Sequence, residues 1–454
     1  MKKFLITVVV MLVLLTGCMT VLLPILGISG TAIAANANVG TGVSAKLACS
    51  GRYLSGLDED QISSDLASYT PATNLLSVHF DDQARRVTAS LAGMAVTAAQ
   101  YREGLGCSLE IGDTAALDAL RVPQLPPTAG AWPEGEADNA LLTPVQAMLE
   151  EILAADNASG MQTRALLLAH KGRLVAEIYA DGFDQSSMLL GWSMAKSLTA
   201  IMLGHLEMLG RLRVDEVNLF SQWQGDGRAA ISIEHLLQMS SGLDFAEVYT
   251  PGSDAMAMLF TAHSASDVAL ASKLGHAPGT YFSYSSGATN MLARLLTERL
   301  GGTQAAVDFL AYNLFKPMGI RHTIMELDAS GVFVGSSYAY GSGRDWARLG
   351  QLMLNGGELN GVRLLSKDWV ARSRMPNSSN NDARYGYQFW LNSGGLQLRW
   401  PALPADAYAM SGNRAQTVMI VPSADAVIVR LGWTSGSYPM EENFAQLLEV
   451  LNHY

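Results

Sequence analysis

The chain has 454 residues, of which 49% are hydrophobic and 16% are charged, and its formal net charge is −11. This length allows two domains, or one large domain with an extension, and the composition allows a substantial core. The negative charge argues against a nucleic-acid partner, because such a partner requires a basic face. The sequence contains no block of like charge that would indicate an acidic tail or a polybasic membrane patch.

The N-terminus has the pattern of a targeting segment, in which two lysines precede an apolar run over residues 4–35. Three interpretations stay open: a signal peptide cleaved at the small residues 32–34, a lipoprotein with lipid on Cys18, and an uncleaved anchor of about 20 apolar residues. We expect residues 1–35 to export the protein and attach it to a membrane, so that the rest of the chain faces the periplasm.

Residues 36–135 are predicted to form a small N-terminal extension domain. Within it, residues 78–82 and 86–91 have the pattern of short strands joined by a polar turn, and no motif in this region carries chemistry. The proline-rich residues 123–133 mark the boundary to a second domain, which we expect over residues 136–454.

The two cysteines outside the targeting segment, Cys49 and Cys107, agree with export. A disulfide between them would persist only in an oxidising compartment. Closing this loop would stabilise the fold by about 4 kcal/mol in the chain-entropy model. Two independent buried thiols are the alternative interpretation.

The second domain has predicted strands at both of its ends and predicted helices between them. The strands are expected over residues 164–170, 174–179, 416–421 and 426–431, and the helices over residues 144–153, 193–209, 288–300 and 344–355. Antiparallel strands from both ends around a helical middle describe an α+β fold. We expect one antiparallel sheet flanked by helices, with a mostly helical subdomain inserted.

Ser193 and Lys196 are the candidate nucleophile and base, and they form the only Ser-x-x-Lys pair in the chain. Residues three apart on a helix share a face, with Cβ atoms about 5–6 Å apart. At the start of a buried helix, Ser193 would lie where the helix dipole favours developing negative charge. A desolvated lysine beside the hydroxyl is a recognised way to activate a serine. An ordinary helix start is the alternative reading of the same four residues.

The order of motifs resembles that of the β-lactamase-related serine hydrolases, in which Ser-x-x-Lys carries the nucleophile. The pair follows an apparent hairpin over residues 167–177 and precedes the stretches 234–243 and 278–287. The resemblance covers about residues 165–433 and is nearest to the class C-like branch that contains esterases and 6-aminohexanoate-dimer hydrolase. It implies the same α+β fold, with the site in the cleft between the sheet and the helical subdomain.

The resemblance places a second motif, Tyr-x-Asn in the class C-like enzymes, at Tyr284. A free phenol has a pKa of about 10, and an ammonium at Lys196 within about 4–6 Å would favour its anion. Tyr284 could then take the Ser193 proton and return it to the leaving group. Ser286 replaces the asparagine of the motif and could still donate a hydrogen bond to substrate. A core aromatic after a turn is the alternative reading of Tyr284.

The third motif of these enzymes, Lys-Thr-Gly, does not occur, and the stretch before the last hairpin takes its place. By the resemblance, Gly412 lets the strand approach the substrate, and the backbone N–H of Asn413 forms an oxyanion hole with that of Ser193. Losing one such donor typically costs about 10²–10³ in rate. Met410 in place of the lysine removes a cation that would hold a substrate carboxylate, a role that Arg414 could take.

Tyr338 is a further candidate to line the cleft, and core packing is its alternative role. No cluster of histidines and cysteines predicts a metal, and no motif predicts a cofactor. The sequence therefore predicts a membrane-attached serine hydrolase that cleaves small esters or amides through an acyl-Ser193 intermediate. The alternatives are a penicillin-binding-protein-like D-alanyl peptidase or weak β-lactamase, and a non-catalytic envelope binding protein on the same fold.

Overall fold

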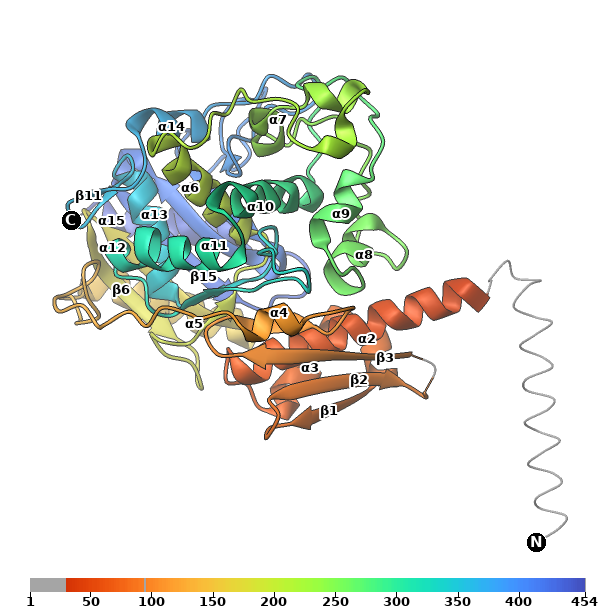
Figure 1. Ribbon diagram of the computed structural model, residues 1–454. Coiled ribbons are helices and arrows are strands. Elements are labelled where there is room, and N and C mark those ends of the chain that lie inside the picture. The colour runs from red at the N-terminus through yellow and green to blue at the C-terminus, as the bar shows by residue number, and fades with distance from the viewer. Residues whose placement is uncertain (1–29, 94, 454) are drawn as a thin grey trace, which may run out of the picture.

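The computed structural model describes residues 30–93 and 95–453, which form a small N-terminal unit packed below a larger body (Figure 1). The predictions for residues 1–29, including a lipid on Cys18, lie outside the described residues. In the described part of the chain, no helix has both the length and the apolar character needed to cross a membrane.

The N-terminal unit, called the extension below, consists of the long helix α2 packed on a four-stranded antiparallel sheet with the order β1-β2-β3-β4, together with shorter helices. Its elements are α2 (Gly30–Tyr53), α3 (Glu59–Tyr69), η1 (Pro71–Leu75), β1 (Ser77–Asp81), β2 (Arg86–Leu91), β3 (Ala95–Arg102), β4 (Gly106–Leu109) and α4 (Ala115–Asp118). Helix α2 begins before the expected boundary at residue 36 and runs through residues 32–34, because this alanine-rich stretch favours helix.

The larger body is built on a six-stranded antiparallel sheet with the order β12-β13-β14-β15-β5-β6. Its strands are β5 (Thr163–His170), β6 (Arg173–Tyr179), β12 (Trp390–Leu391), β13 (Tyr408–Gly412), β14 (Gln416–Val421) and β15 (Ala426–Gly432). Strand β15 pairs with β5, so that strands from the two ends of the predicted second domain meet in the middle of the sheet. The α+β architecture expected from the sequence is confirmed.

Helices cover both faces of this sheet. Alternate residues of its strands point to opposite sides, and apolar side chains on both sides need a packing partner. Leu166 and Leu168 pack in one apolar cluster with α5 (Thr143–Ala158) and α15 (Met440–Leu451). Leu167, on the opposite face, joins the main core, which includes α6 (Met194–Met208) and α13 (Gly343–Leu354). Both faces are therefore buried, which explains why the strands are apolar throughout.

The remaining elements form the helical part between β6 and β12 (Figure 1). Its helices are η2 (Ser221–Trp223), η3 (Gly227–Ala230), α7 (Ile233–Leu237), α8 (Asp254–Phe260), α9 (Ala265–Leu270), α10 (Ser286–Leu300), α11 (Thr303–Phe309), η4 (Leu310–Phe315), α12 (Lys316–Met318) and α14 (Lys367–Ser373). Its strands are β7 (Leu189–Leu190), β8 (Thr323–Met325), β9 (Ala339–Gly341), β10 (Glu358–Leu359) and β11 (Val362–Arg363). Two further 3₁₀ turns, η5 (Asn413–Ala415) and η6 (Pro422–Ala424), lie within the large sheet's connections.

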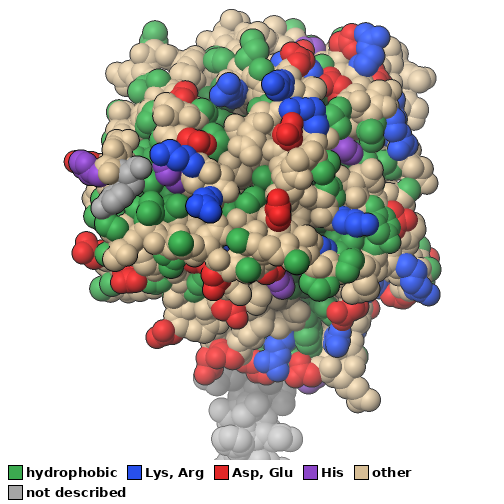
Figure 2. Space-filling view, turned by 90° about the vertical axis from the view of Figure 1, so that its left-hand side faces the viewer, with side chains coloured by type: hydrophobic (Ala, Val, Ile, Leu, Met, Phe, Trp, Pro, Cys, Tyr) green, Lys and Arg blue, Asp and Glu red, His purple; other side chains and the backbone are tan. Residues whose placement is uncertain are grey.

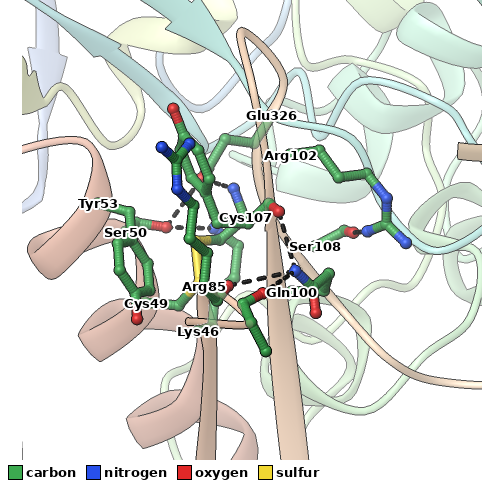
Figure 3. Close-up of a disulfide and its surroundings, with 12 residues drawn as sticks. Lys46, Cys49, Ser50, Tyr53, Arg85, Gln100, Arg102, Cys107, Ser108 and Glu326 are labelled. Carbon is green, nitrogen blue, oxygen red and sulfur yellow. Dashed lines mark hydrogen bonds and ion pairs between the residues drawn. A yellow bond between two sulfur atoms is a disulfide. The ribbon is translucent and has the colours of Figure 1, made fainter. Parts of the chain in front are cut away.

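A buried polar cluster fastens the extension to the larger body (Figure 3). Glu326, which follows β8, accepts hydrogen bonds from the Lys46 ammonium, the Ser50 hydroxyl and the Cys107 amide. The disulfide expected from the sequence joins Cys49 on α2 to Cys107 on β4. Because every polar partner of the Glu326 carboxylate comes from the extension, this cluster fixes how the two parts pack.

The surface of the body is mixed in charge on the face shown in Figure 2. Acidic and basic side chains are interspersed there with apolar and uncharged ones. The net charge of −11 is therefore not gathered into a single acidic surface on that face.

Candidate active site

Ser193 occupies the N-cap position of α6, immediately after a strained turn. The preceding residue, Trp192, has a φ of 48°, which is in the left-handed region that side chains other than glycine rarely adopt. The first amides of α6 bond back over three residues, with Met194 donating to Gly191 and Lys196 donating to Ser193. This turn brings the hydroxyl to the N-terminal end of the helix, where the positive end of the helix dipole favours developing negative charge.

Lys196 lies beside the candidate nucleophile Ser193, as the helical spacing predicted. Its Nζ is 3.1 Å from Ser193 Oγ and also donates to Ser286 Oγ at 2.9 Å and to the Ser336 carbonyl at 3.0 Å. The side chain is 1% exposed, and this burial lowers the pKa of Lys196 to about 8, against an opposing effect of Glu247. A lysine with such a pKa is partly unprotonated near neutral pH and can act as a base.

Tyr284 is held next to this pair by aromatic packing. Its ring centre is 4.8 Å from Lys196 Nζ and stacks on Trp390 at 5.1 Å between ring centres. Burial raises the pKa of Tyr284 well above its ordinary value, an interaction with Ser193 opposes the rise, and the charge of Glu247 adds to it. The expected tyrosinate is therefore not favoured, because burial and the charge of Glu247 both raise the pKa of Tyr284.

Ser286 is the first residue of α10 and is fully buried. Its hydroxyl accepts the Lys196 hydrogen bond and donates to the carboxylate of Glu247 at 2.5 Å, and its amide donates to the same carboxylate at 2.6 Å. The sequence predicted Ser286 as a substrate contact. In the structure it instead links the candidate base to Glu247, and both of its polar groups are used in doing so.

Glu247 is a site residue that the sequence did not reveal. It lies between α7 and α8 in a segment without regular structure, and Tyr249 also donates to its carboxylate at 2.8 Å. No motif includes it. The one available signal was the serine that replaces asparagine at Ser286, since a smaller side chain there leaves room for another hydrogen-bond partner.

Gly412 closes the site from the side of the large sheet. A Cβ on this residue would lie 2.1 Å from the Gly191 carbonyl oxygen, so only glycine lets β13 approach the turn that carries Ser193. Asn413 follows directly in η5 and is exposed. This close approach sets the backbone next to Asn413 against the backbone next to Ser193, the arrangement that the expected oxyanion hole requires.

Arg414 is turned toward the extension. Its guanidinium donates to the Ser68 carbonyl at 2.6 Å and lies 5.5 Å from the ring centres of both Tyr69 and Trp433. The residue itself has a φ of 62°. A role as replacement for the missing lysine stays a prediction, and the contacts that the structure shows join the extension, at Ser68 and Tyr69, to Trp433 of the larger body.

Tyr338 does not line the cleft, and that expectation was wrong. It is 1% exposed, its hydroxyl donates to the Leu259 carbonyl at 3.0 Å, and the Lys46 ammonium lies 4.1 Å from its ring centre. Core packing and the buried lysine account for its position. The segment contributes to the site through the carbonyl of Ser336 instead.

Comparison with known proteins gives a consistent result. The model of the Beta-lactamase family matches residues 145–451. A 6-aminohexanoate-dimer hydrolase from Paenarthrobacter ureafaciens is 25% identical over an aligned length of 290 residues, in a match that covers 59% of this chain and 72% of that protein. These matches begin after the extension or cover about the length of the larger body alone.

Solved structures show the same fold at low sequence identity. A Bacillus anthracis protein assigned as a candidate 6-aminohexanoate-dimer hydrolase has a TM-score of 0.59 and 19% identity over 75% of this chain and 92% of its own. A family VIII carboxylesterase has a TM-score of 0.54 and 16% identity over 69% of this chain and 99% of its own.

Proposed function

This chain belongs to the Beta-lactamase family, and we propose that it is a serine hydrolase that cleaves ester or amide bonds of small substrates through an acyl-Ser193 intermediate. The observation that carries the proposal is the 3.1 Å contact between Ser193 Oγ and the buried Lys196 Nζ at the start of α6. A hydroxyl next to a lysine of lowered pKa is an activated nucleophile. The family and the expected motifs therefore agree on the reaction type.

Lys196 is the base that fits the first step. With a pKa of about 8, its free amine can accept the Ser193 proton as the oxygen attacks the carbonyl carbon. The two N–H groups of the free amine donate to the Ser286 hydroxyl and the Ser336 carbonyl, so the lone pair of the nitrogen faces Ser193. The new bond joins Ser193 Oγ to the acyl carbon, and the carbonyl oxygen becomes an oxyanion near the amides of Ser193 and Asn413.

Tyr284 then acts as a neutral phenol. Its raised pKa keeps the proton on the hydroxyl, so that it can donate to the leaving oxygen or nitrogen while the bond to the acyl carbon breaks. The proton that Lys196 took from Ser193 replaces the one that Tyr284 gives up. Water resolves the acyl-Ser193 ester by the same route in reverse, which restores the hydroxyl and releases the acid.

The substrate class we favour is a small ester or a linear amide of the 6-aminohexanoate type. Two of the similar proteins carry names of the 6-aminohexanoate-dimer hydrolase type and one is a carboxylesterase. Met410 is fully buried and stands where D-alanyl peptidases and β-lactamases of the resemblance carry the lysine of Lys-Thr-Gly. That substitution disfavours a substrate carboxylate at this point of the site.

Hydrolysis of p-nitrophenyl acetate and butyrate by the full-length protein in mild detergent tests the proposal. We expect turnover by the parent, loss of nearly all of it in Ser193→Ala, and parent activity in Ser221→Ala, which removes an exposed serine on η2. Equal inertness of parent and Ser193→Ala, together with no labelling by a fluorophosphonate, would overturn it. Labelling by a fluorescent penicillin without ester turnover would instead favour the peptidase.

A further inference from the structure

A cavity of about 690 Å³ lies between the extension and the larger body, beside the candidate active site. On the side of the body it is lined by Tyr249 and Asn413, among others. On the side of the extension it is lined by residues of α2, including Val39 and Gly40, and by Ala72 of η1. The extension therefore supplies one wall of a space that reaches Asn413, the residue of the proposed oxyanion hole.

The α2 wall is held firmly against the body. A Cβ at Gly42 would lie 2.2 Å from the Phe260 carbonyl oxygen, so the backbones of α2 and α8 are in direct contact at this point. Gly40, two residues earlier, lines the cavity, and an added Cβ there would make an ordinary van der Waals contact with Leu76 Cδ1 at 3.6 Å. One glycine of α2 thus serves close packing and the other borders the cavity.

The same wall contacts the catalytic segments directly. The ring of Tyr69 stacks on that of Trp192, the residue before Ser193, at 5.7 Å between centres and 11° between planes. Arg414, the residue after Asn413, donates to the Ser68 carbonyl. Tyr69 therefore links the cavity wall to the turn that carries Ser193, and Asn413, of the proposed oxyanion hole, lines the cavity itself.

The side chains that line the cavity are nearly all uncharged. Among the described residues that line the cavity, Arg414 is the one charged side chain, and the Ser68 carbonyl and two aromatic rings already engage its guanidinium. The rest are small, hydroxyl, amide or apolar residues such as Val43 and Met256. Such a lining stabilises an uncharged carbon chain by burial and offers no acidic partner for an amino group.

We propose that the extension forms the wall of a subsite that selects substrates by their acyl group, and that the subsite accepts neutral, linear acyl chains longer than acetyl. The inference rests on the proposed serine hydrolase function and narrows its substrate class to neutral esters, because an acyl group of the 6-aminohexanoate type would carry an ammonium into a cavity without an acidic partner. The carbonyl oxygen is held at Asn413, next to the cavity, so the chain attached to that carbonyl is the part of the substrate that enters it.

Filling the cavity from the extension tests this assignment in the full-length protein. Gly40→Leu adds a side chain from α2 at the cavity wall, and Ala72→Trp adds one from the exposed η1 turn. Val96→Trp is the matched control, because Val96 is 61% exposed on β3 of the same extension. The readout is the ratio of kcat/KM for p-nitrophenyl decanoate to that for p-nitrophenyl acetate.

We expect the parent to prefer decanoate, and the ratio to fall at least about tenfold in both filling variants, as loss of contact with two or more methylenes would cause. The control should keep the parent's ratio. Ser193-dependent turnover with an unchanged ratio, or a parent that hydrolyses acetate but not decanoate, would overturn the inference alone. Absence of any Ser193-dependent turnover would overturn the proposed function and the inference together.

A second pair of substrates tests whether the cavity prefers an uncharged acyl chain. The mono-p-nitrophenyl ester of adipate has the same chain length as the hexanoate ester but ends in a carboxylate. We expect the hexanoate ester to be the better substrate of the parent by at least about tenfold, because the carboxylate would lose its hydration in a cavity whose cation is already engaged. Preference for the adipate ester would show that Arg414 recognises an anion and would overturn the neutral assignment.

Discussion

Gly191 and Gly412 contact each other backbone to backbone, since a Cβ on Gly412 would come within 2.1 Å of the Gly191 carbonyl oxygen. The contact joins the turn that positions Ser193 to the strand that leads to Asn413. Two segments more than 200 residues apart in the chain are thereby brought to the two sides of one carbonyl-binding position. The proposed oxyanion hole depends on this contact more directly than on any side chain.

Replacing Gly412 by alanine should therefore impair catalysis more than folding. The added methyl group must push β13 away from the nucleophile turn, and we expect kcat/KM for p-nitrophenyl esters to fall by at least about 100-fold, the effect of losing one oxyanion donor. Gly275→Ala is the control, because an added Cβ there has its nearest neighbour at 3.6 Å. Activity of Gly412→Ala within twofold of the parent would contradict the role.

The rate should rise with pH as Lys196 loses its proton. Burial lowers the pKa of Lys196 to about 8, so the protonated form dominates below that pH and the basic form above it. We expect kcat/KM to increase from about pH 6 to about pH 9 and then to level off, with a midpoint near the lysine pKa. Lys273→Met, at an exposed lysine, should keep this profile. A flat or falling profile over this range would argue against Lys196 as the base.

Glu247 should set the position of that midpoint. Its charge raises the pKa of Lys196, against the larger effect of burial. Glu247→Gln keeps an acceptor for the Ser286 amide but removes the charge, so the midpoint should move to lower pH. Glu151→Gln, on the exposed side of α5, is the matched control. If the profile of Glu247→Gln coincides with that of the parent, the carboxylate does not act on the lysine.

The buried ion pair between Lys46 and Glu326 (Figure 3) should show a large coupling free energy in a double-mutant cycle of protein stability. Lys46→Met leaves the Glu326 carboxylate buried without its cation, and we expect the free energy of unfolding to fall by about 3–5 kcal/mol. Lys46→Met/Glu326→Leu removes both charges and should recover much of that loss. Urea unfolding of the four proteins measures the coupling, and additive effects of the two single changes would show that the pair is not linked.

The disulfide should stabilise the extension by lowering the conformational entropy of the unfolded chain. Cys49 and Cys107 are 58 residues apart, and closing a loop of this length contributes about 4 kcal/mol in the chain-entropy model. The variant with serine at both positions should unfold at correspondingly lower denaturant concentration, and a reducing agent should shift the parent toward it. If the reducing agent shifts the serine variant equally, the effect has another source.

Much of the fold was predictable because its signals are local. The strands β5, β6, β14 and β15 are short apolar runs bounded by turns, and α6, α10 and α13 have helical patterns, so each could be recognised from neighbouring residues. The pairing of Ser193 with Lys196 was predictable for the same reason, since both lie on one turn of one helix. Strands such as β12 and β7 are two residues long and carry too little pattern to be recognised.

The sequence by itself determined the candidate nucleophile, the adjacent lysine and the family, because these depend on spacing within single elements and on the order of motifs. Only the tertiary structure decided what surrounds them. Burial by many separate segments raises the pKa of Tyr284, and packing of α10 against the loop before α8 brings Glu247 to Ser286. Contacts between distant segments also place Tyr338 in the core and α2 beside the site. Burial and long-range contact are properties of the whole packed chain, and no local pattern encodes them.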